Sequence, residues 1–261
     1  MACPFCPDRT GKVDKKKSLS VTVPGGYYRC FKCGAHGRDT SLSPENVQDI
    51  TAPAGHAVLP EGFTPLSGDR SFIFEGARAY LEGRHVPAEV WEALGIGATV
   101  RGRYAHRIII PLMENLTLFG FVARSYVPTT RPYLYPPGME RHFFNGDALH
   151  LDTQMPVVVT EGIMDAVPLW PDSVACLGKP THTHVTQLAA TNRPVVCLLD
   201  GDAWTDNWSL ALKLKMAGRP AITVRLPAGE DPGSLGRAWL TENVLKNTVG
   251  GEGFLDLQHT A

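Results

Sequence analysis

The clearest pattern in the chain is a set of short apolar runs that end in acidic residues. Residues 156–160 read Pro-Val-Val-Val-Thr and lead into Glu161, and residues 194–199 read Pro-Val-Val-Cys-Leu-Leu and lead into Asp200. Runs of this length without polar alternation are typical of parallel strands that are buried on both faces. A third run at 222–226 follows a helical segment. Strands that alternate with helices predict a mostly parallel sheet with right-handed crossovers.

The middle of the chain has a different pattern. Residues 77–81 and 87–94 have helical spacing, and Pro87 suits a first helical turn. The apolar runs 107–112 and 116–122 flank a short polar turn, which predicts an antiparallel hairpin. We therefore expect an α+β subdomain ahead of the parallel sheet.

The first 40 residues contain two Cys-x-x-Cys pairs separated by an alternating apolar pattern and a Pro-Gly-Gly turn. A two-residue spacer lets both thiolates of a pair reach one tetrahedral zinc ion. A ribbon of about 40 residues has too small a core to be stable alone, so zinc should supply much of its folding free energy. Two disulfides are the alternative, which the lack of a secretion signal disfavours. The predicted zinc ligands are Cys3, Cys6, Cys30 and Cys33.

The net charge of −1 conceals opposite local charges. Residues 1–40 carry eight Lys/Arg and three Asp (+5), and residues 41–100 carry three basic and eight acidic residues (−5). Residues 101–150 carry six and three (+3), and residues 151–261 carry eight and twelve (−4). Basic segments beside an acidic one suit a protein that holds a polyanion and also gathers cations, although ordinary surface variation is the alternative.

Nothing in the sequence indicates export or membrane insertion. With 43% hydrophobic residues the chain can build globular cores, but it has no run of about 18 apolar residues and no signal-peptide pattern. We expect a cytoplasmic protein, in the host cytoplasm if it is phage-encoded.

The acidic residues that follow the apolar runs should converge. Because the carboxyl ends of parallel strands share one edge of a sheet, Glu161, Asp200, Asp202 and Asp231 are expected there. Clustered carboxylates repel unless cations lie between them, and hard oxygen ligands favour Mg²⁺ or Mn²⁺. A single Asp-Gly-Asp is more often a turn than a metal site, but three acidic motifs that each end a strand-like run are stronger evidence.

Basic and aromatic residues supply possible nucleic-acid contacts. Arg103, Arg107 and Arg124 lie on or next to predicted strands, where they could grip phosphates, although scattered surface arginines are the alternative. In the ribbon, a lysine-rich segment at 12–17 accompanies aromatic residues at 27–31 that could stack on unpaired bases.

Taken in order, these motifs resemble the bacterial and phage DNA primases, which combine an N-terminal zinc-binding domain with a Toprim polymerase core. The resemblance covers nearly the whole chain to about residue 240. The segments that carry it are the two cysteine pairs, 80–84, 94–97, 107–112, 120–124, 160–165, 190–192, 199–202 and 226–232.

The resemblance implies template-directed synthesis of RNA primers from NTPs on single-stranded DNA, with structural zinc and catalytic Mg²⁺ or Mn²⁺. Glu161 would be the Toprim glutamate, Asp200, Asp202 and Asp231 the metal-binding aspartates, and Asp165 a supporting acid. Residues expected to hold nucleotide or template are Arg103, Arg107, Arg124, Arg131 and Lys179.

The sequence departs from the family pattern at several positions. The motif often written Asp-Pro-Asp is Asp-Pro-Gly at 231–233, which removes one carboxylate. Two positions that are often basic in the family are Pro132 and Asn145, and either Arg131 or Arg141 is near enough to compensate.

We expect five regions in the mixed α/β chain. They are a zinc ribbon (1–40), a proline-containing linker (41–70), a basic α+β subdomain (71–152), a Toprim subdomain (153–240) and a tail (241–261). With a tail of about 20 residues we expect neither a helicase nor a sizeable helicase-binding domain, and we expect a replicative helicase to bind another surface.

Two other functions remain open at this point. A non-catalytic recombination mediator can also combine a zinc module with a Toprim fold, but the N-terminal position of the ribbon and the arginine-rich middle segment argue against it. A Toprim nuclease is the other, whereas a topoisomerase is disfavoured because the chain is short for strand passage.

Overall fold

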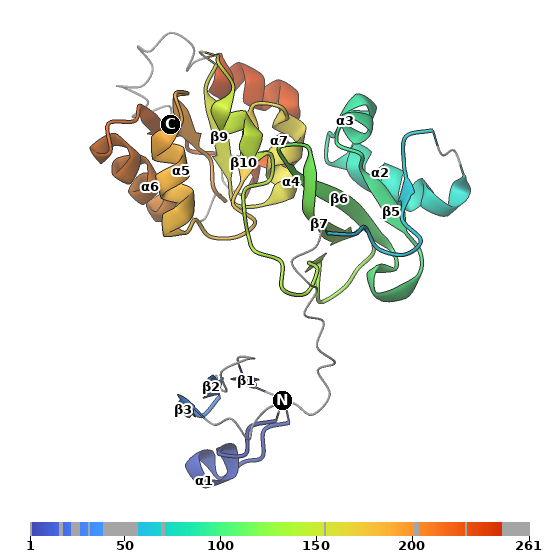
Figure 1. Cartoon of the computed structure of the whole chain (residues 1–261), viewed down its shortest axis with the longest axis vertical. Coiled ribbons are helices and arrows are strands. Elements are labelled where there is room, and N and C mark those ends of the chain that lie inside the picture. Colours follow the sequence, from blue (N-terminus) through green and yellow to red (C-terminus); the bar gives the residue numbers. More distant parts are fainter. Residues whose placement is uncertain are drawn as a thin grey trace. The chain divides into compact units, whose positions relative to one another are not determined.

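The computed structural model describes residues 2–15, 18–21, 27–30, 32–38, 57–68, 71–153, 155–200, 204–227 and 229–246. The chain divides into two compact units, Met1–Pro53 and Ala54–Ala261 (Figure 1). No helix among the described residues is both long and apolar enough to span a bilayer. The mixed α/β fold class predicted from the sequence is confirmed.

The first unit is a small zinc-ribbon-like fold. Its helix α1 (Cys6–Thr10) is followed by the antiparallel strands β1 (Leu19–Val21), β2 (Tyr27–Cys30) and β3 (His36–Arg38), in the order β1-β2-β3. Cysteines make up most of its core, together with Leu19 and Ala35. So small an apolar core agrees with the expectation that metal binding stabilises this unit.

The second unit begins with a five-stranded antiparallel sheet in the order β4-β5-β6-β7-β8. The predicted hairpin is present as its two long central strands. The strands are β4 (Thr64–Pro65), β5 (Gly97–Thr99), β6 (Arg107–Glu114), β7 (Thr117–Ser125) and β8 (Tyr133–Leu134).

Helices cover one face of this sheet. The predicted helical segments form α2 (Glu75–Gly83) and α3 (Ala88–Ala93), with Pro87 at the N-cap of α3. A 3₁₀ turn, η2 (Phe72–Phe74), precedes α2, and a second, η3 (Gly102–Tyr104), precedes β6. Leu81 and Trp91 of these helices pack in one buried cluster with Ile110 of the sheet.

The segment predicted as a linker, 41–70, contributes to the other face of the sheet. Leu59 and Phe63 pack against Ile109 and Phe121 on that face. Leu66, only 2% exposed, packs instead in the cluster on the helix-covered face. The side chains of Leu59 and Phe63 are buried against the sheet even though nearby prolines interrupt the apolar periodicity of the sequence. Residues 59–66 therefore belong to the core unit and not to a linker.

The second sheet of this unit is wholly parallel, in the order β10-β9-β11-β12. This confirms the predicted mostly parallel sheet. Its strands are β9 (Val157–Thr160), β10 (Ser173–Ala175), β11 (Val195–Cys197) and β12 (Ala221–Thr223). Its helical elements are η4 (Gly146–His150), α4 (Ile163–Ala166), η5 (Val167–Leu169), α5 (His182–Ala190), α6 (Trp204–Met216), α7 (Pro232–Leu240) and a π-helical turn, η6 (Thr241–Leu245).

Both faces of the parallel sheet are covered, which explains why its strands are apolar throughout (Figure 1). Val157 and Val159 point to the cluster that includes α5 and α6, whereas Val158 points to the cluster that includes α7 and η6. Val244 and Leu245 of η6 are buried, so the first residues of the predicted tail, 241–261, also belong to the core.

The two sheets share one hydrophobic cluster. Ile163 and Met164 of α4 pack into the same cluster as Ile110 and Val122 of the antiparallel sheet. The basic and Toprim subdomains, which the sequence predicts as separate regions, are therefore joined through α4.

Candidate active site and metal centre

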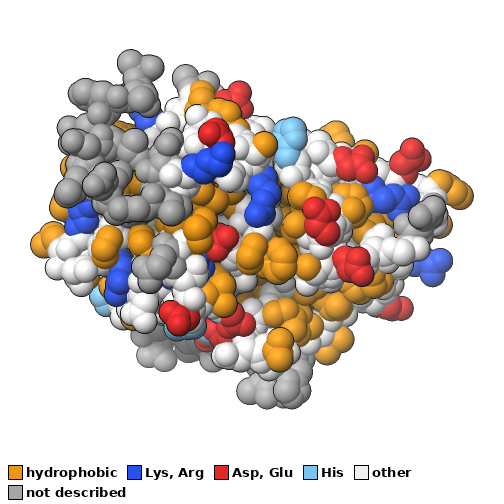
Figure 2. All heavy atoms as spheres, turned by 90° about the horizontal axis from the view of Figure 1, so that it is seen from above, with side chains coloured by type: hydrophobic (Ala, Val, Ile, Leu, Met, Phe, Trp, Pro, Cys, Tyr) orange, Lys and Arg blue, Asp and Glu red, His pale blue; other side chains and the backbone are white. Residues whose placement is uncertain are grey.

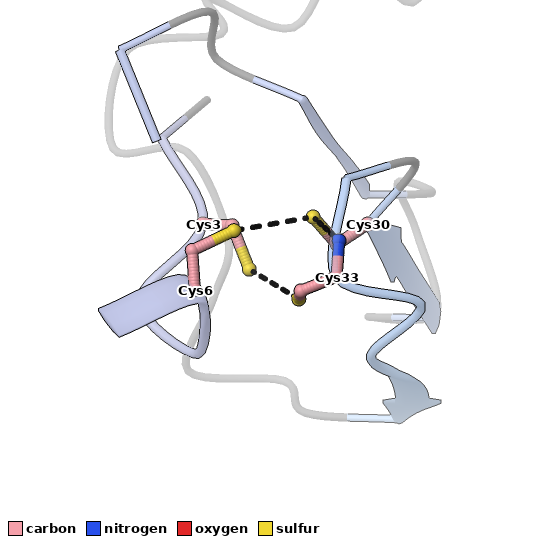
Figure 3. Close-up of side chains that lie close together, drawn as sticks. All are labelled: Cys3, Cys6, Cys30 and Cys33. Atoms are coloured by element: carbon pink, nitrogen blue, oxygen red, sulfur yellow. Dashed lines mark hydrogen bonds between the residues drawn. The ribbon is translucent and has the colours of Figure 1, made fainter. Parts of the chain in front are cut away.

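Four cysteine sulfurs converge in the first unit (Figure 3). Cys3 Sγ lies 3.7 Å from Cys33 Sγ, Cys6 Sγ lies 3.7 Å from Cys30 Sγ, and all four atoms lie within 4.8 Å of one another. Tetrahedral zinc with Zn–S bonds of about 2.3 Å would separate its sulfurs by about 3.8 Å. The donor set and its spacing fit a structural zinc ion.

Backbone groups around Cys30 favour the thiolate. The amide groups of Lys32 and Cys33 each donate to Cys30 Sγ over 3.4 Å. Burial raises the pKa of Cys30, but these two amides and the neighbouring thiols of Cys33 and Cys3 together outweigh it and lower the pKa to about 7. Burial raises the pKa of Cys6, so that thiol needs the metal itself to ionise.

Asp14 supports this centre and was missed by the sequence analysis. Its side chain is buried, and Oδ2 accepts hydrogen bonds from the backbone amides of Cys3 (3.1 Å) and Ser18 (2.6 Å). It thereby ties the first metal-binding turn to the start of β1. Nothing in the sequence pattern distinguishes Asp14 from an ordinary aspartate in a loop.

At the carboxyl edge of the parallel sheet, two predicted acids follow neighbouring strands. Cys197 pairs with Val159, and the Leu198 amide donates to the Val159 carbonyl over 2.9 Å. Glu161, directly after β9, and Asp200, three residues after β11, therefore lie at adjacent strand ends.

Asn207 fixes the chain just before Asp200. Its Oδ1 accepts from the Leu199 amide over 2.7 Å, and its Nδ2 donates to the Leu199 carbonyl over 3.2 Å. Beyond the end of β11, this buried side chain from α6 makes the backbone hydrogen bonds that a neighbouring strand would otherwise make. These two hydrogen bonds fix the backbone that leads into Asp200.

Asp165 lies within the same electrostatic environment. It is 8% exposed, and its Oδ1 accepts a hydrogen bond from the Gly233 amide over 3.2 Å. Burial, followed by the negative charges of Asp231 and Asp200, raises the pKa of Asp165 to about 7. Asp200 and Asp231 are thus close enough to Asp165 to oppose its ionisation.

Asp231 has two other interactions. Its Oδ1 accepts from the Ser234 amide over 2.7 Å and so caps α7. The guanidinium of Arg84 donates to Asp231 Oδ1 over 3.0 Å and Oδ2 over 3.3 Å. Arg84, on the segment after α2, is thus a second site residue to which the sequence analysis gave no role, although it ends one of the motifs.

Two glycines make room for this arrangement. A Cβ atom on Gly162 would lie 2.5 Å from Asp165 Oδ2. A Cβ atom on Gly233 would lie 2.8 Å from the Met164 carbonyl oxygen and 3.1 Å from Arg84 Nη1. The position at which the family often carries another aspartate therefore has no space for a side chain here.

We call the carboxyl edge of the parallel sheet, with Glu161, Asp165, Asp200 and Asp231, the acidic edge. It is less compact than the cysteine centre. Asp202 lies outside the described residues. Among the residues that are described, the four cysteines form the only group of three or more potential ligands within 4.8 Å of one another.

Among the predicted basic residues, Arg124 lies on the side of the antiparallel sheet that packs against α4. Arg124 is on the face of β7 that carries Val122, which packs against α4. Its Nε donates to the Tyr80 hydroxyl over 2.7 Å, and its guanidinium lies 4.6 Å from the Tyr133 ring centroid. Burial raises the pKa of Tyr133, and the charges of Arg124 and Asp165 act on it in opposite directions.

Arg107 has a structural role instead of the predicted contact with nucleotide or template. It is 7% exposed and lies on the opposite face of the sheet from Arg124. Its guanidinium donates to the carbonyls of Ala123, Pro132 and Arg131 over 2.8–3.2 Å. Because its side chain starts at the first residue of β6 and reaches the loop before β8, it holds that loop.

The remaining predicted basic residues are exposed at the surface. The Arg103 guanidinium lies 5.7 Å from the Tyr104 ring centroid, and Arg131 is exposed. Lys179 donates to Asp206 over 2.9 Å in a solvent-exposed ion pair. On the face shown in Figure 2, acidic and basic side chains are interspersed, so charge alone does not outline a template groove there.

No family model matches the sequence. The chain is similar to the DNA primase of Salmonella typhimurium, with 26% identity over 90% of this chain and 54% of the relative. It is also similar to the solved structure of the DnaG primase catalytic domain bound to ssDNA, with a TM-score of 0.53 and 26% identity over 67% of this chain and 70% of that one. The zinc-binding and RNA polymerase domains of the Aquifex aeolicus primase have a TM-score of 0.55 and 18% identity over 93% and 75% of the chains, which shows a shared fold. The chain spans about half the length of the curated relatives that it matches.

Proposed function

We propose that this relative of the bacterial DNA primases is itself a DNA primase, which synthesises short RNA primers from NTPs on a single-stranded DNA template. The observation that carries the proposal is the acidic edge of the parallel sheet. There Asp165 is held beside Asp200 and Asp231, and Arg84 links the edge to the basic subdomain.

The carboxylates suit hard divalent cations. Burial and the neighbouring negative charges oppose ionisation of Asp165, and a cation would relieve that opposition. Glu161, Asp200, Asp202 and Asp231 would hold Mg²⁺ or Mn²⁺, with Asp165 as a supporting acid. When bound, such ions activate an attacking 3′-hydroxyl and stabilise a leaving pyrophosphate.

The chain's own basic groups would orient the substrates. Arg124 is fixed by Tyr80 and Tyr133 on the sheet face that packs against α4, so it needs little reorganisation to meet a phosphate. Arg103 and Arg131 are exposed and would contact template or nucleotide from outside. Lys179 would have to leave Asp206 before it could contribute.

The zinc ribbon would contact the template. Arg9, Lys12 and Lys15 are exposed there and can neutralise phosphates. One of the similar solved structures is a primase catalytic domain bound to ssDNA, which supports single-stranded DNA as the template. A replicative helicase is a further possible partner, to be tested by co-purification.

The test is direct synthesis. The full chain is incubated with single-stranded DNA, labelled NTPs and Mg²⁺ or Mn²⁺, and the products are resolved by length. We expect short oligoribonucleotides. Absence of product on every template would refute the proposal, and cleavage of the template would indicate the nuclease alternative.

A variant pair tests the acidic edge. Asp200→Ala should abolish synthesis and leave the affinity for single-stranded DNA nearly unchanged, because it removes a metal ligand and not a phosphate contact. The matched control is Asp152→Ala, an exposed aspartate before β9, at the opposite end of that strand. Equal loss of synthesis and DNA binding in Asp200→Ala would contradict the assigned role.

A further inference from the structure

Helix α6 carries an exposed row of large apolar side chains that the proposed function does not use. Trp204, Trp208, Leu212 and Met216 are spaced four residues apart, and each is between 41% and 81% exposed. Residues at this spacing follow one side of a helix. We call these four residues the α6 stripe. Single exposed apolar residues are ordinary, but a row of four that includes two tryptophans is typical of a surface that another molecule covers.

The α6 stripe lies on the side of the helix that faces away from α5. Asp206 of α6 pairs with Lys179, which lies in the segment just before α5. At about 100° per residue, Trp208 is about 160° around the helix from Asp206. The side of α6 that packs on the sheet is formed by Asn207, Leu210, Ala211 and Leu214.

The parallel sheet is open on the same side. Its last strand, β12, pairs with β11 and with no other strand among the described residues. At the opposite edge of the sheet, an antiparallel bridge to Phe144 covers part of β10. Because α6 packs against β11 and β12, its side away from α5 faces outward past β12 (Figure 1). The α6 stripe and the open strand edge thus lie on one side of the sheet.

The two ends of the α6 stripe differ in charge. Lys215 is exposed near the C-terminal end, at nearly the same angle around the helix as the two tryptophans. The other end begins at Trp204, four residues after Asp200 of the acidic edge. A second copy whose α6 runs antiparallel would bring its Lys215 toward this acidic end, and symmetry repeats the contact. A parallel copy would instead bring the two lysines together.

The side chains of the α6 stripe also match one another in the antiparallel arrangement. A twofold axis beside Leu210, the midpoint of the stripe, places Trp208 opposite Leu212 of the other copy. It likewise places Trp204 opposite Met216 of the other copy. Each tryptophan then packs on an aliphatic side chain, and the two helix dipoles oppose each other favourably.

The area of the α6 stripe suits a reversible dimer. At about 200 Å² for each whole side chain, the exposed fractions correspond to about 450 Å² per copy. Two copies would bury about 900 Å² from the stripe alone, which is close to the roughly 1,000 Å² that a specific interface needs. An interface of this size is expected to have a dissociation constant on the order of 1–10 µM.

We propose that this chain forms a twofold-symmetric dimer through the α6 stripe, with the two α6 helices antiparallel. The second copy is the occupant because the stripe is complementary to itself in both shape and charge. Since the two helices run in opposite directions, the two acidic edges lie at opposite ends of the interface. The dimer does not depend on the activity of the acidic edge.

Sedimentation velocity of the zinc-loaded full chain over about 1–100 µM measures the association directly. We expect the proportion of dimer to rise across this range. Leu212→Glu should raise the dissociation constant about tenfold or more, because it places a carboxylate against Trp208 of the other copy. Leu116→Glu is the matched control, since it makes the same substitution at an exposed leucine between β6 and β7 and should leave the dissociation constant unchanged. Circular dichroism checks that both variants are folded.

A mixing experiment tests the orientation of the two helices. Trp208→Cys and Leu212→Cys chains are oxidised separately and together, and the unaltered chain shows any linkage through the native cysteines. Antiparallel packing predicts more disulfide-linked dimer in the mixture than in either variant alone, because positions 208 and 212 face each other across the axis. Equal linkage in Trp208→Cys alone would indicate parallel packing and overturn the proposal.

The remaining outcomes are equally decisive. A chain that stays monomeric up to about 100 µM overturns the inference, and so does a dimer that folded Leu212→Glu leaves unchanged. Tryptophan fluorescence of a monomeric chain that is quenched by single-stranded DNA, with the quenching lost in Trp208→Ala, would assign the stripe to base stacking and also overturns it. A dimer that makes no primers leaves this inference standing and counts only against the proposed function.

Discussion

Replacing Asp165 by asparagine should stabilise the protein at alkaline pH. The side chain is buried next to Asp200 and Asp231, and its pKa is raised from 3.8 to about 7. The amide oxygen introduced by Asp165→Asn would still accept from the Gly233 amide, while the charge that the site opposes would be gone. A gain in stability from loss of a site residue is expected where a site concentrates like charges.

The magnitude follows from the pKa. Raising the pKa of Asp165 from 3.8 to about 7 corresponds to about 4 kcal/mol of unfavourable free energy when the side chain is ionised. The unfolded chain loses this proton near pH 4 and the folded chain near pH 7. Stability of the wild type therefore falls as the pH rises through that interval, and no such fall occurs in the variant. Between pH 5 and pH 8 the advantage of the variant should grow by about 2–3 kcal/mol.

The assay is denaturant and thermal unfolding of the wild type and Asp165→Asn at pH 5 and pH 8, without added Mg²⁺ or Mn²⁺. At pH 8 the variant's melting temperature should rise by about 8–16 °C for a unit of this size. Adding Mg²⁺ at pH 8 should stabilise the wild type more than the variant, because the cation relieves the same repulsion. Asp152→Asn, an exposed substitution, is the control and should show no pH-dependent gain.

The reasoning would be refuted by a variant that is no more stable than the wild type at pH 8, or by a difference that does not increase with pH. Either result would mean that Asp165 is ionised without opposition, and that the acids lie farther apart than their effect on its pKa implies.

Two further predictions concern the metal centre and the missing carboxylate. Removing zinc with a chelator, or substituting Cys30→Ser, should unfold the first unit and leave the second folded. The reason is that cysteines make up most of the first unit's core and that structural zinc contributes roughly 10 kcal/mol or more to its folding free energy. A two-dimensional NMR spectrum checks this, and retention of the ribbon's dispersed signals would contradict it. Gly233→Asp, which restores the family's carboxylate, should lower stability by about 2 kcal/mol or more and reduce synthesis, because the new side chain meets the Met164 carbonyl and Arg84. Thermal unfolding checks it. Gly83→Asp is the control, because a Cβ atom there meets no atom within 4 Å and its backbone does not have a positive φ.

The sequence predicts the parallel sheet well because its strands are buried on both faces. Val157, Val158 and Val159 leave no alternation, and the acids that follow β9 and β11 mark where those strands end. The cysteine spacing likewise predicts the metal centre, because two chelating pairs need only a turn to bring them together. In the parallel strands and in the cysteine pairs, the residues that stand out in the local sequence pattern are also the ones that the tertiary structure uses.

Residues that act through long-range contacts could not be predicted in this way. Arg107 and Arg124 look equivalent in the sequence, and only the strand register shows that they lie on opposite faces. The pairing of Arg84 with Asp231 joins residues 147 positions apart. Leu59 and Phe63 look like linker residues because nearby prolines break the apolar periodicity that would indicate a buried face.

The hydrophobic cluster that α4 shares with the antiparallel sheet has a consequence for how substrates meet the site. Arg124 lies on β7 and Asp165 on α4, and side chains of these two elements pack in one hydrophobic cluster. The spacing between Arg124, proposed to bind phosphate, and the acids, proposed to hold cations, is then set during folding, before any ligand arrives. Substrate binding would need to order only the ligand, which lowers the entropic cost of reaching a reactive geometry.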